Sequence, residues 1–280
     1  MPELPEVETI VRVLEQRVVR DRVESVWIGS RPQPLKSPAA AIARTLEGKR
    51  IVDVHRTGKY IVFELGPSGH AERKRSSKTG KGTAQWVVHL GMTGRIVICS
   101  PGAELAKHTH LIARLASGRE LRFVDPRMFG RVSVHAGGFD PGGVEPLEIS
   151  ERSFVELFRG RKTPIKSALL NQKLVRGVGN IYADESLFRA GIRPRRRAAA
   201  VTRQEFGSLY RSVRAVLREA IKLGGSSVSD YVDADGEEGL FQMRHRVYAR
   251  EGEPCLVCGT AIRRVVLAGR SSHFCPKCQK

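Results

Sequence analysis

The motifs CLVC at 255–258 and CPKC at 275–278 stand sixteen residues apart near the end of the sequence. Two Cys-x-x-Cys pairs at this spacing are typical of a zinc ribbon, in which two tight turns hold one tetrahedral ion. Four thiolates leave no position for water, so we expect one structural zinc ion rather than a catalytic one. Its ligands are expected to be Cys255, Cys258, Cys275 and Cys278. The hairpin between the motifs presents arginines suited to gripping phosphate, namely Arg263, Arg264 and Arg270.

The positive charge of the sequence extends well beyond this ribbon. Its 280 residues include 48 Lys and Arg against 29 Asp and Glu, a formal net charge of +19. An excess spread along the whole chain indicates a polyanionic partner, with nucleic acid the first choice and an anionic membrane surface the second. The sequence has no apolar run near the ~20 residues that span a bilayer, and its acidic start is unlike a signal peptide. We therefore expect a cytoplasmic protein.

Upstream of the ribbon the pattern is helical. Helices are predicted at 150–159, from 163–164 onward and at 181–190, each bounded by cap residues or glycine. Thr202 and Glu205 form a capping box that opens a long amphipathic helix to Leu223. The turn RGVGN at 176–180 leads into a helix N-terminus, a position suited to holding phosphate, although glycines in such turns are usually only turn formers.

The first half of the chain is rich in short β-branched runs separated by Gly, Ser and Pro turns, a pattern that predicts a β-sandwich or barrel. One short helix is expected between the first two strands, with Ser37 as its N-cap. Cys99 lies in one of the strands and is expected to be buried. Glycines and prolines gather at 136–146, which we interpret as a linker. The predicted domains are 1–135, 147–240 and, for the zinc finger, 241–280.

Two basic turns in this half each allow two interpretations. Lys59 follows Gly58 between two strands, where its side chain either projects to one side of a sheet or is simply an exposed hairpin lysine. The stretch 66–83 holds five Lys and Arg residues among Ser and Gly without periodicity. Such a loop either touches phosphates nonspecifically or is only a solvated insertion.

The sequence PELPE at 2–6 offers a nucleophile and two carboxylates. Removal of Met1 would leave Pro2 as a secondary amine, and α-amino groups titrate near pH ~8, so a neutral fraction exists at physiological pH. Attack on an aldehyde-level carbon gives an imine, the electron sink that an elimination requires. Glu3 and Glu6 are candidate proton donors and acceptors. The alternative is that Pro5 and the acids only begin a helix over 5–20.

With these pieces assembled, the chain resembles the bacterial formamidopyrimidine-DNA glycosylases, which are also DNA-(apurinic or apyrimidinic site) lyases. The matching motifs are PELPEVE at 2–8, GKY at 58–60, HLGMTG at 89–94, DPRMFG at 125–130, GVGNIYADES at 177–186 and the zinc ribbon. The resemblance implies an α+β fold: an N-terminal β-sandwich with flanking helices, a helix-two-turns-helix bundle and a zinc-ribbon finger. It also places duplex DNA in the cleft between the halves.

The resemblance further implies roles for individual residues. Pro2 would form the Schiff base at C1′ of the sugar, and Glu3 would assist ring opening. Lys59 would donate a proton in β-elimination or clamp the adjacent phosphate. Arg270 matches a residue assigned to proton donation in δ-elimination, although a guanidinium with a pKa above ~12 is chemically better suited to gripping phosphate.

DNA contacts are also carried over from the family. Strand or backbone contacts match His108, Arg127, Lys162 and Asn180. The residues that fill the stack where the damaged nucleotide is flipped out match Met92, Arg127 and Phe129. Met128 stands where a second arginine is common, and the stretch 224–239 resembles the loop that closes over the extruded base.

We therefore expect a bifunctional glycosylase and AP lyase of base excision repair that removes 8-oxoguanine and formamidopyrimidines through β,δ-elimination. Its expected partner is double-stranded DNA with oxidised bases or abasic sites, and we expect a monomer associated with the bacterial nucleoid and not with a membrane. Two alternatives stay open. One is an endonuclease VIII-like enzyme for oxidised pyrimidines, and the other is a noncatalytic zinc-ribbon DNA-binding protein.

Overall fold

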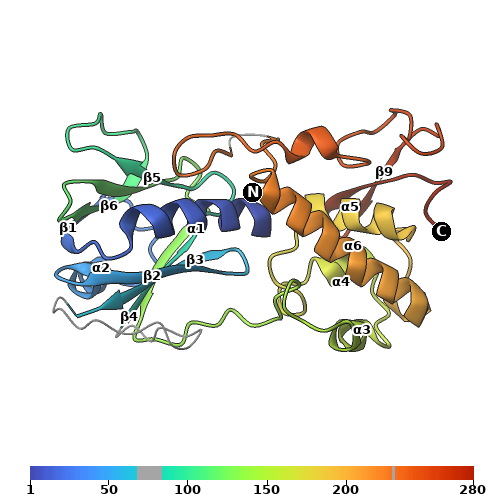
Figure 1. Cartoon of the computed structure of the whole chain (residues 1–280), viewed down its shortest axis with the longest axis horizontal. Helices are drawn as coiled ribbons and strands as arrows, with labels where there is room; N and C mark the ends of the chain where they lie inside the picture. Colours follow the sequence, from blue (N-terminus) through green and yellow to red (C-terminus); the bar gives the residue numbers. More distant parts are fainter. Residues whose placement is uncertain (68–83, 229–230) are drawn as a thin grey trace. The chain divides into compact units, whose positions relative to one another are not determined.

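The structure, a computed structural model, describes residues 1–67, 84–228 and 231–280 (Figure 1). The chain divides into two compact units. The N-terminal unit comprises Met1–Pro2, Glu6–Asp140 and Ser227–Gly239, and the C-terminal unit comprises Glu3–Pro5, Pro141–Ser226 and Leu240–Lys280. Most of the basic loop predicted at 66–83 lies outside the described residues. The two units meet along the chain at Asp140 and Pro141, inside the stretch interpreted as a linker.

The N-terminal unit contains two antiparallel four-stranded sheets. One has the order β1 (Val23–Ile28), β6 (Thr109–Leu115), β7 (Glu120–Val124) and β5 (Arg95–Cys99). The other has the order β2 (Arg50–Thr57), β3 (Tyr60–Gly66), β4 (Ala84–His89) and β8 (Arg131–His135). These strands form from the short β-branched runs of the first half, because β-branched residues favour a half-buried pleated surface.

One hydrophobic core joins the two sheets and the first helix. Helix α1 (Leu4–Val18) contributes the apolar stripe that its 3.6-residue period predicts, Val7, Ile10, Val11, Leu14 and Val18. Phe63 and Trp86 stack in this core with ring centroids 4.3 Å apart. Figure 1 shows α1 lying alongside the sheets. The β-sandwich prediction is therefore confirmed for this unit.

Two local predictions in this unit are wrong. Helix α2 (Ala39–Leu46) has Pro38 as its N-cap, because the hydroxyl of Ser37 instead accepts a hydrogen bond from the backbone N–H of Val134 (3.1 Å). Cys99 is half-buried rather than buried, because it lies at the last position of β5. Neither difference changes the sandwich.

The C-terminal unit is a helical bundle with a β-hairpin. Its helices are α3 (Glu151–Phe158), α4 (Ile165–Leu169), α5 (Asn180–Ala190) and α6 (Arg203–Lys222), with 3-10 turns η1 (Ala198–Ala200) and η2 (Phe241–Arg244). The hairpin consists of β9 (Arg263–Leu267) and β10 (Arg270–Phe274). Figure 1 shows α5 and α6 side by side, and the stripe predicted on α6 is buried at Phe206, Leu209, Val213, Val216 and Leu217. Within the described residues, no helix combines the length and apolar character needed to cross a membrane.

The capping box of α6 gives a test of this bundle. Thr202 Oγ1 accepts the N–H of Glu205, and the Glu205 carboxylate accepts the N–H of Thr202. Hydrogen bonding from Arg196 lowers the pKa of Glu205 to about 2. Because the folded pKa lies below the unfolded value, this carboxylate stabilises the fold above about pH 4.5, and the contribution disappears as the pH falls toward 2.

We therefore expect Glu205→Gln to lower the free energy of unfolding by about 1 kcal/mol at pH 7. The difference in the free energy of unfolding between Glu205→Gln and wild type, measured by urea denaturation, should shrink as the pH is lowered from 5 to 3. Glu156→Gln, which removes a solvent-exposed ion pair with Arg159, is the control and should change little. A Glu205→Gln difference that stays constant over this pH range would contradict the assignment.

Candidate functional site

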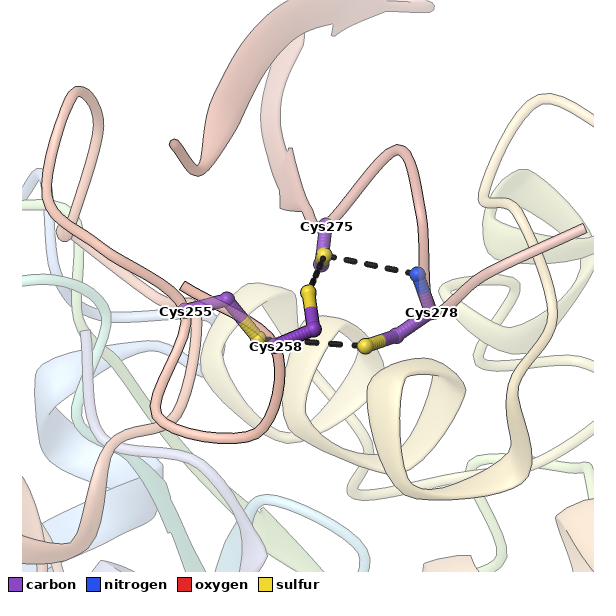
Figure 2. A group of neighbouring side chains, drawn as sticks. All are labelled: Cys255, Cys258, Cys275 and Cys278. Atoms are coloured by element: carbon purple, nitrogen blue, oxygen red, sulfur yellow. Dashed lines mark hydrogen bonds between the residues drawn. The ribbon is translucent and has the colours of Figure 1, made fainter. Parts of the chain in front are cut away.

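The four cysteines of the predicted ribbon point their sulfurs toward one another (Figure 2). All four sulfurs lie within 4.8 Å of one another; the Cys255 to Cys278 distance is 3.9 Å and the Cys258 to Cys275 distance is 3.5 Å. Disulfides are excluded, because an S–S bond measures about 2.05 Å. A zinc ion at ~2.3 Å from each sulfur requires sulfurs about 3.8 Å apart. The thiolates therefore fit one structural zinc ion, which clamps the ends of the β9–β10 hairpin.

The hairpin is held to the helical bundle by Asp184 of α5. Asp184 Oδ2 accepts the backbone N–H of His273 (2.9 Å) and lies 3.2 Å from its ring Nδ1. Asp184 Oδ1 pairs with Lys166 Nζ at 2.7 Å, and Lys166 also donates to the carbonyl of Ser271 (2.6 Å). Both charged side chains are almost fully buried, and burial lowers the pKa of Lys166 while Asp184 opposes that shift. This pair fixes the strand that begins with Arg270.

The next residue of α5, Glu185, organises the segment before the ribbon. Its carboxylate accepts three consecutive backbone N–H groups at 2.9 Å to 3.0 Å, those of Arg246, Val247 and Tyr248. Burial raises the pKa of Glu185, and these amides act in the opposite direction. Sequence reasoning missed Asp184 and Glu185 as organising residues. The available signal was a pair of adjacent acids in the middle of the helix predicted at 181–190, with apolar residues on both sides of them.

Three predicted DNA contacts lie in this unit. Arg270 is exposed at the start of β10, and Lys162 is exposed before α4. Asn180 is the first residue of α5 and is half-buried. Arg270 and Lys162 are therefore accessible cations, as a phosphate contact requires, and Arg270 is carried by a strand.

The N-terminus of α5 receives the start of the chain. The N–H of Leu4 donates to the carbonyl of Gly177 (3.0 Å), and the N–H of Ile181 donates to Glu3 Oε1 (3.1 Å). A carboxylate at a helix N-terminus is stabilised by the helix dipole. The N–H of Ile181 is thus bonded to a carboxylate of the chain itself, and a phosphate contact at this turn stays a prediction.

The glycines of the same turn make room for this contact. A Cβ on Gly179 would lie 2.2 Å from Cδ of Glu3, and a Cβ on Gly177 would lie 2.7 Å from the Leu4 side chain. Gly177 also has a φ of +90°, which L side chains rarely adopt. The motif GVGN therefore requires glycine because residues 3 and 4 pack against its backbone.

In the N-terminal unit, Pro2 and Glu6 are buried while Met1 is exposed. The hydroxyl of Tyr231 donates to the carbonyl of Glu6 (3.2 Å), and burial followed by the charge of Glu6 raises the pKa of Tyr231. Tyr231 and Ala234 belong to the core of this unit. Tyr231 and Ala234 of the stretch 224–239 are thus anchored in the same unit as Glu6.

Lys59 lies in the β2–β3 turn after Gly58, whose φ is +60°. It is only 7% exposed, so the interpretation as an ordinary solvated hairpin lysine is wrong. His89 lies close by, and burial, together with the charges of Lys59 and Arg131, lowers its pKa to about 4. Its Nδ1 accepts the N–H of Gly91 (3.0 Å), which also requires an unprotonated nitrogen. The neighbour of Lys59 is therefore a neutral imidazole at physiological pH.

Two loops of the N-terminal unit expose large apolar side chains. Met92 follows β4 and is 42% exposed, and Phe129 lies between β7 and β8 and is 53% exposed. Arg127 is exposed too, with Cζ 4.9 Å from the centroid of the Phe129 ring. Met128, between them, is half-buried with a φ of +55°. The structure thus gathers two predicted stack-filling residues, Arg127 and Phe129, into one cation–π pair.

The four-cysteine ribbon defines a zinc-ribbon protein, and its net charge of +19 indicates a polyanionic partner. The comparisons with known proteins are more specific. Residues 1–132 match the formamidopyrimidine-DNA glycosylase N-terminal domain, residues 143–232 match the formamidopyrimidine-DNA glycosylase H2TH domain, and residues 252–280 match the zinc finger found in FPG and IleRS. The chain therefore belongs to the formamidopyrimidine-DNA glycosylase family.

Individual relatives agree over the full length. The formamidopyrimidine-DNA glycosylase of Solibacter usitatus is 45% identical over 284 residues and covers 100% of both chains. A mutant of the Lactococcus lactis FPG in complex with DNA containing Fapy-dG superposes with a TM-score of 0.88 at 34% identity, covering 100% of both chains. The wild-type L. lactis protein in complex with DNA containing an oxidised pyrimidine gives a TM-score of 0.86 at 33% identity, again with 100% coverage.

Removing the zinc ion is expected to unfold the hairpin selectively. Without the ion, four adjacent thiolates lose their common ligand, and metal-binding free energy is folding free energy in such sites. Hydrogen exchange after chelation should show β9 and β10 losing protection while the strands of the N-terminal unit keep theirs. Cys275→Ser should behave in the same way. Cys99→Ser, which alters the cysteine outside the cluster, is the control. Full protection of the hairpin from hydrogen exchange without zinc would contradict the assignment of a structural zinc ion.

Proposed function

We propose that this chain is a bifunctional DNA glycosylase and AP lyase of base excision repair that removes oxidised purines, chiefly 8-oxoguanine and formamidopyrimidines, from duplex DNA. Its family, and the L. lactis relative solved with DNA containing Fapy-dG, support this substrate class. The observation that carries the proposal is the N-terminus. Pro2 is followed by a Glu3 carboxylate held on the N-terminus of α5, where a nucleophile and a carboxylate are kept on a rigid element.

The chemistry assigned to Pro2 begins once Met1 has been removed. The nitrogen lone pair of Pro2 attacks C1′ of the damaged nucleotide, the bond from C1′ to the base breaks, and the base leaves with a proton. The Glu3 carboxylate then takes the proton from the Pro2 nitrogen and passes it to the ring oxygen as the bond from C1′ to that oxygen breaks, which leaves a positively charged imine at C1′. This imine is the electron sink for the steps that follow.

Two eliminations complete the reaction. Loss of a proton from C2′ breaks the bond from C3′ to oxygen and expels one phosphate with the bonding electrons. A second proton loss breaks the bond from C5′ to oxygen and expels the other phosphate. We assign Lys59 to proton transfer or to clamping of the adjacent phosphate, and Glu6 as a second acid or base. For Arg270 we favour the phosphate clamp, because a guanidinium forks onto phosphate but gives up its proton poorly.

The exposed residues of the N-terminal unit suit the extrusion step. Turning a base out of the stack costs a few kcal/mol. Burying apolar side chains such as Met92 and Phe129 stabilises by roughly 1.5–3 kcal/mol each when complete, so filling the vacated space offsets part of that cost. Arg127 carries only donors and therefore suits an orphaned cytosine, whose O2 and N3 accept, better than an adenine. We assign His108, Lys162 and Asn180 to the phosphate backbone.

Sodium borohydride trapping on matched duplexes tests the proposal. The protein is expected to form a reduced covalent adduct with DNA containing 8-oxoguanine opposite cytosine, and mass spectrometry should place the adduct on Pro2. Without borohydride, the products should be a one-nucleotide gap with phosphate at both ends. A form that retains Met1 is the control, and it should form no adduct on Pro2 because its proline nitrogen is an amide.

The same assay separates the alternatives. The L. lactis relative has also been solved with DNA containing an oxidised pyrimidine, which favours keeping an endonuclease VIII-like preference as the second candidate. Faster trapping on thymine glycol than on 8-oxoguanine would overturn the purine assignment. Binding without any trapping on either duplex would instead indicate a noncatalytic DNA-binding protein.

The setting of the activity is also a proposal. We infer a monomer that acts on chromosomal DNA in the bacterial cytoplasm, since a net charge of +19 gives affinity for any duplex. The three family matches support domains close to those predicted, with a sandwich at 1–135, a helical domain at 147–240 and a zinc finger at 241–280.

A further inference from the structure

Three segments of the N-terminal unit carry its predicted DNA-contacting side chains. We name two of them the wedge loops: residues 91–94, which contain Met92, and residues 126–130, which contain Arg127 and Phe129. The third is the residue before β6, His108, whose φ of +68° is unusual for a side chain other than glycine. Loops normally vary in position more than the strands that bear them. Side chains that enter a stack of nucleobases therefore need loops that are held in a fixed position.

The buried side chain of Asp125 holds these loops. It directly follows β7 and is 0% exposed. Its Oδ1 accepts the hydroxyl of Thr93 at 2.6 Å and the N–H of Arg127 at 3.2 Å, and its Oδ2 accepts the N–H of Gly130 at 2.7 Å. One carboxylate thus binds both wedge loops.

The backbone of Asp125 reaches the third segment. Its N–H donates to the carbonyl of His108 (3.0 Å), and its own carbonyl lies 2.9 Å from Nε2 of His110. The N–H of Met128 donates to the same carbonyl (3.3 Å). His108 is therefore tied to the residue that ties the wedge loops.

The two wedge loops also touch directly, and only glycine permits it. A Cβ on Gly91 would lie 2.5 Å from the backbone N of Gly130 and 2.5 Å from the carbonyl carbon of Phe129. A Cβ on Gly130 would lie 2.6 Å from the Phe123 ring and 3.0 Å from Oδ2 of Asp125. The loops are thus pressed together at one end and joined through one carboxylate.

We propose that Asp125 is the positioning residue of the wedge, and that its bond to Thr93 couples Met92 to Arg127 and Phe129 so that they enter the stack as one body. Hydrogen bonds to a buried carboxylate are among the stronger ones, because the acceptor is charged. Asp125 touches no substrate in this role. It acts on base extrusion and on reading of the opposite base, and not on the chemistry at Pro2. The proposal rests on the proposed function.

The matched pair Thr93→Val and Thr93→Ser tests this coupling. Valine keeps the shape of threonine and removes the hydroxyl, whereas serine keeps the hydroxyl. In Thr93→Val, extrusion measured by stopped-flow fluorescence of 2-aminopurine beside 8-oxoguanine should slow about tenfold. The ratio of excision opposite cytosine to excision opposite adenine should fall as well. Thr93→Ser should retain the wild-type extrusion rate and the wild-type excision ratio.

A second measurement separates positioning from general damage to the fold. Cleavage of a preformed abasic site in single-stranded DNA needs no wedge, so Thr93→Val and Asp125→Asn should both cleave it at the wild-type rate. The proposal would be overturned if Thr93→Val kept the wild-type extrusion rate and the wild-type ratio of excision opposite cytosine to excision opposite adenine. It would also be overturned if Thr93→Val lost activity equally on duplex 8-oxoguanine and on the single-stranded abasic site. A wild-type protein that excises no lesion would overturn the proposed function itself, and with it this inference.

Discussion

The contact between Glu3 and the N-terminus of α5 is the one on which the candidate site depends. It joins the second residue after Met1 to a helix of the C-terminal unit through one carboxylate and one amide, 3.1 Å apart. The neighbouring bond from Leu4 to Gly177 fixes the backbone at the same place. Chain termini are usually the least ordered part of a domain. Here Pro2 and Glu3 are buried and Glu3 is hydrogen-bonded, which suits an α-amine on Pro2 that must act at a defined position.

Several of the predicted functional residues are held in position by buried carboxylates. Asp184 holds the strand of Arg270, Glu185 holds the segment leading to the ribbon, and Asp125 holds the wedge loops. Each accepts backbone N–H groups, so each fixes main chain and not only another side chain. A buried acid without such donors would be strongly destabilising. The positions of the exposed cations and apolar side chains are therefore set by acids that substrate never needs to touch.

Much of the fold could be predicted from the sequence because its signals are local. The strands followed from β-branched runs, α6 from its capping box and apolar period, and the zinc site from cysteine spacing. Pro2, Glu3 and the wedge residues came from motifs. The family implied by those motifs is confirmed, whereas the individual catalytic roles stay predictions.

What the sequence did not reveal depends on contacts between distant residues. Ser37 has the chemistry of an N-cap, yet its hydroxyl bonds a strand 97 residues away. Lys59 has the sequence context of an exposed turn, and only the packing around it makes it buried. The packing of Glu3 against Gly179 was not predictable, because the two residues lie far apart in the sequence. Long-range partners of this kind have no local pattern.

The most direct test of the central claim is the rate of borohydride trapping on abasic-site DNA by Gly179→Ala. The added Cβ would lie 2.2 Å from Cδ of Glu3 and must displace that side chain. We predict a loss of about a hundredfold in the trapping rate, with zinc content and DNA affinity retained. Gly207→Ala is the matched control, since its Cβ meets the flexible ends of the Glu151 and Arg211 side chains and its trapping rate should not change. Trapping by Gly179→Ala at the wild-type rate would contradict the claim that the anchored Glu3 positions the reactive amine.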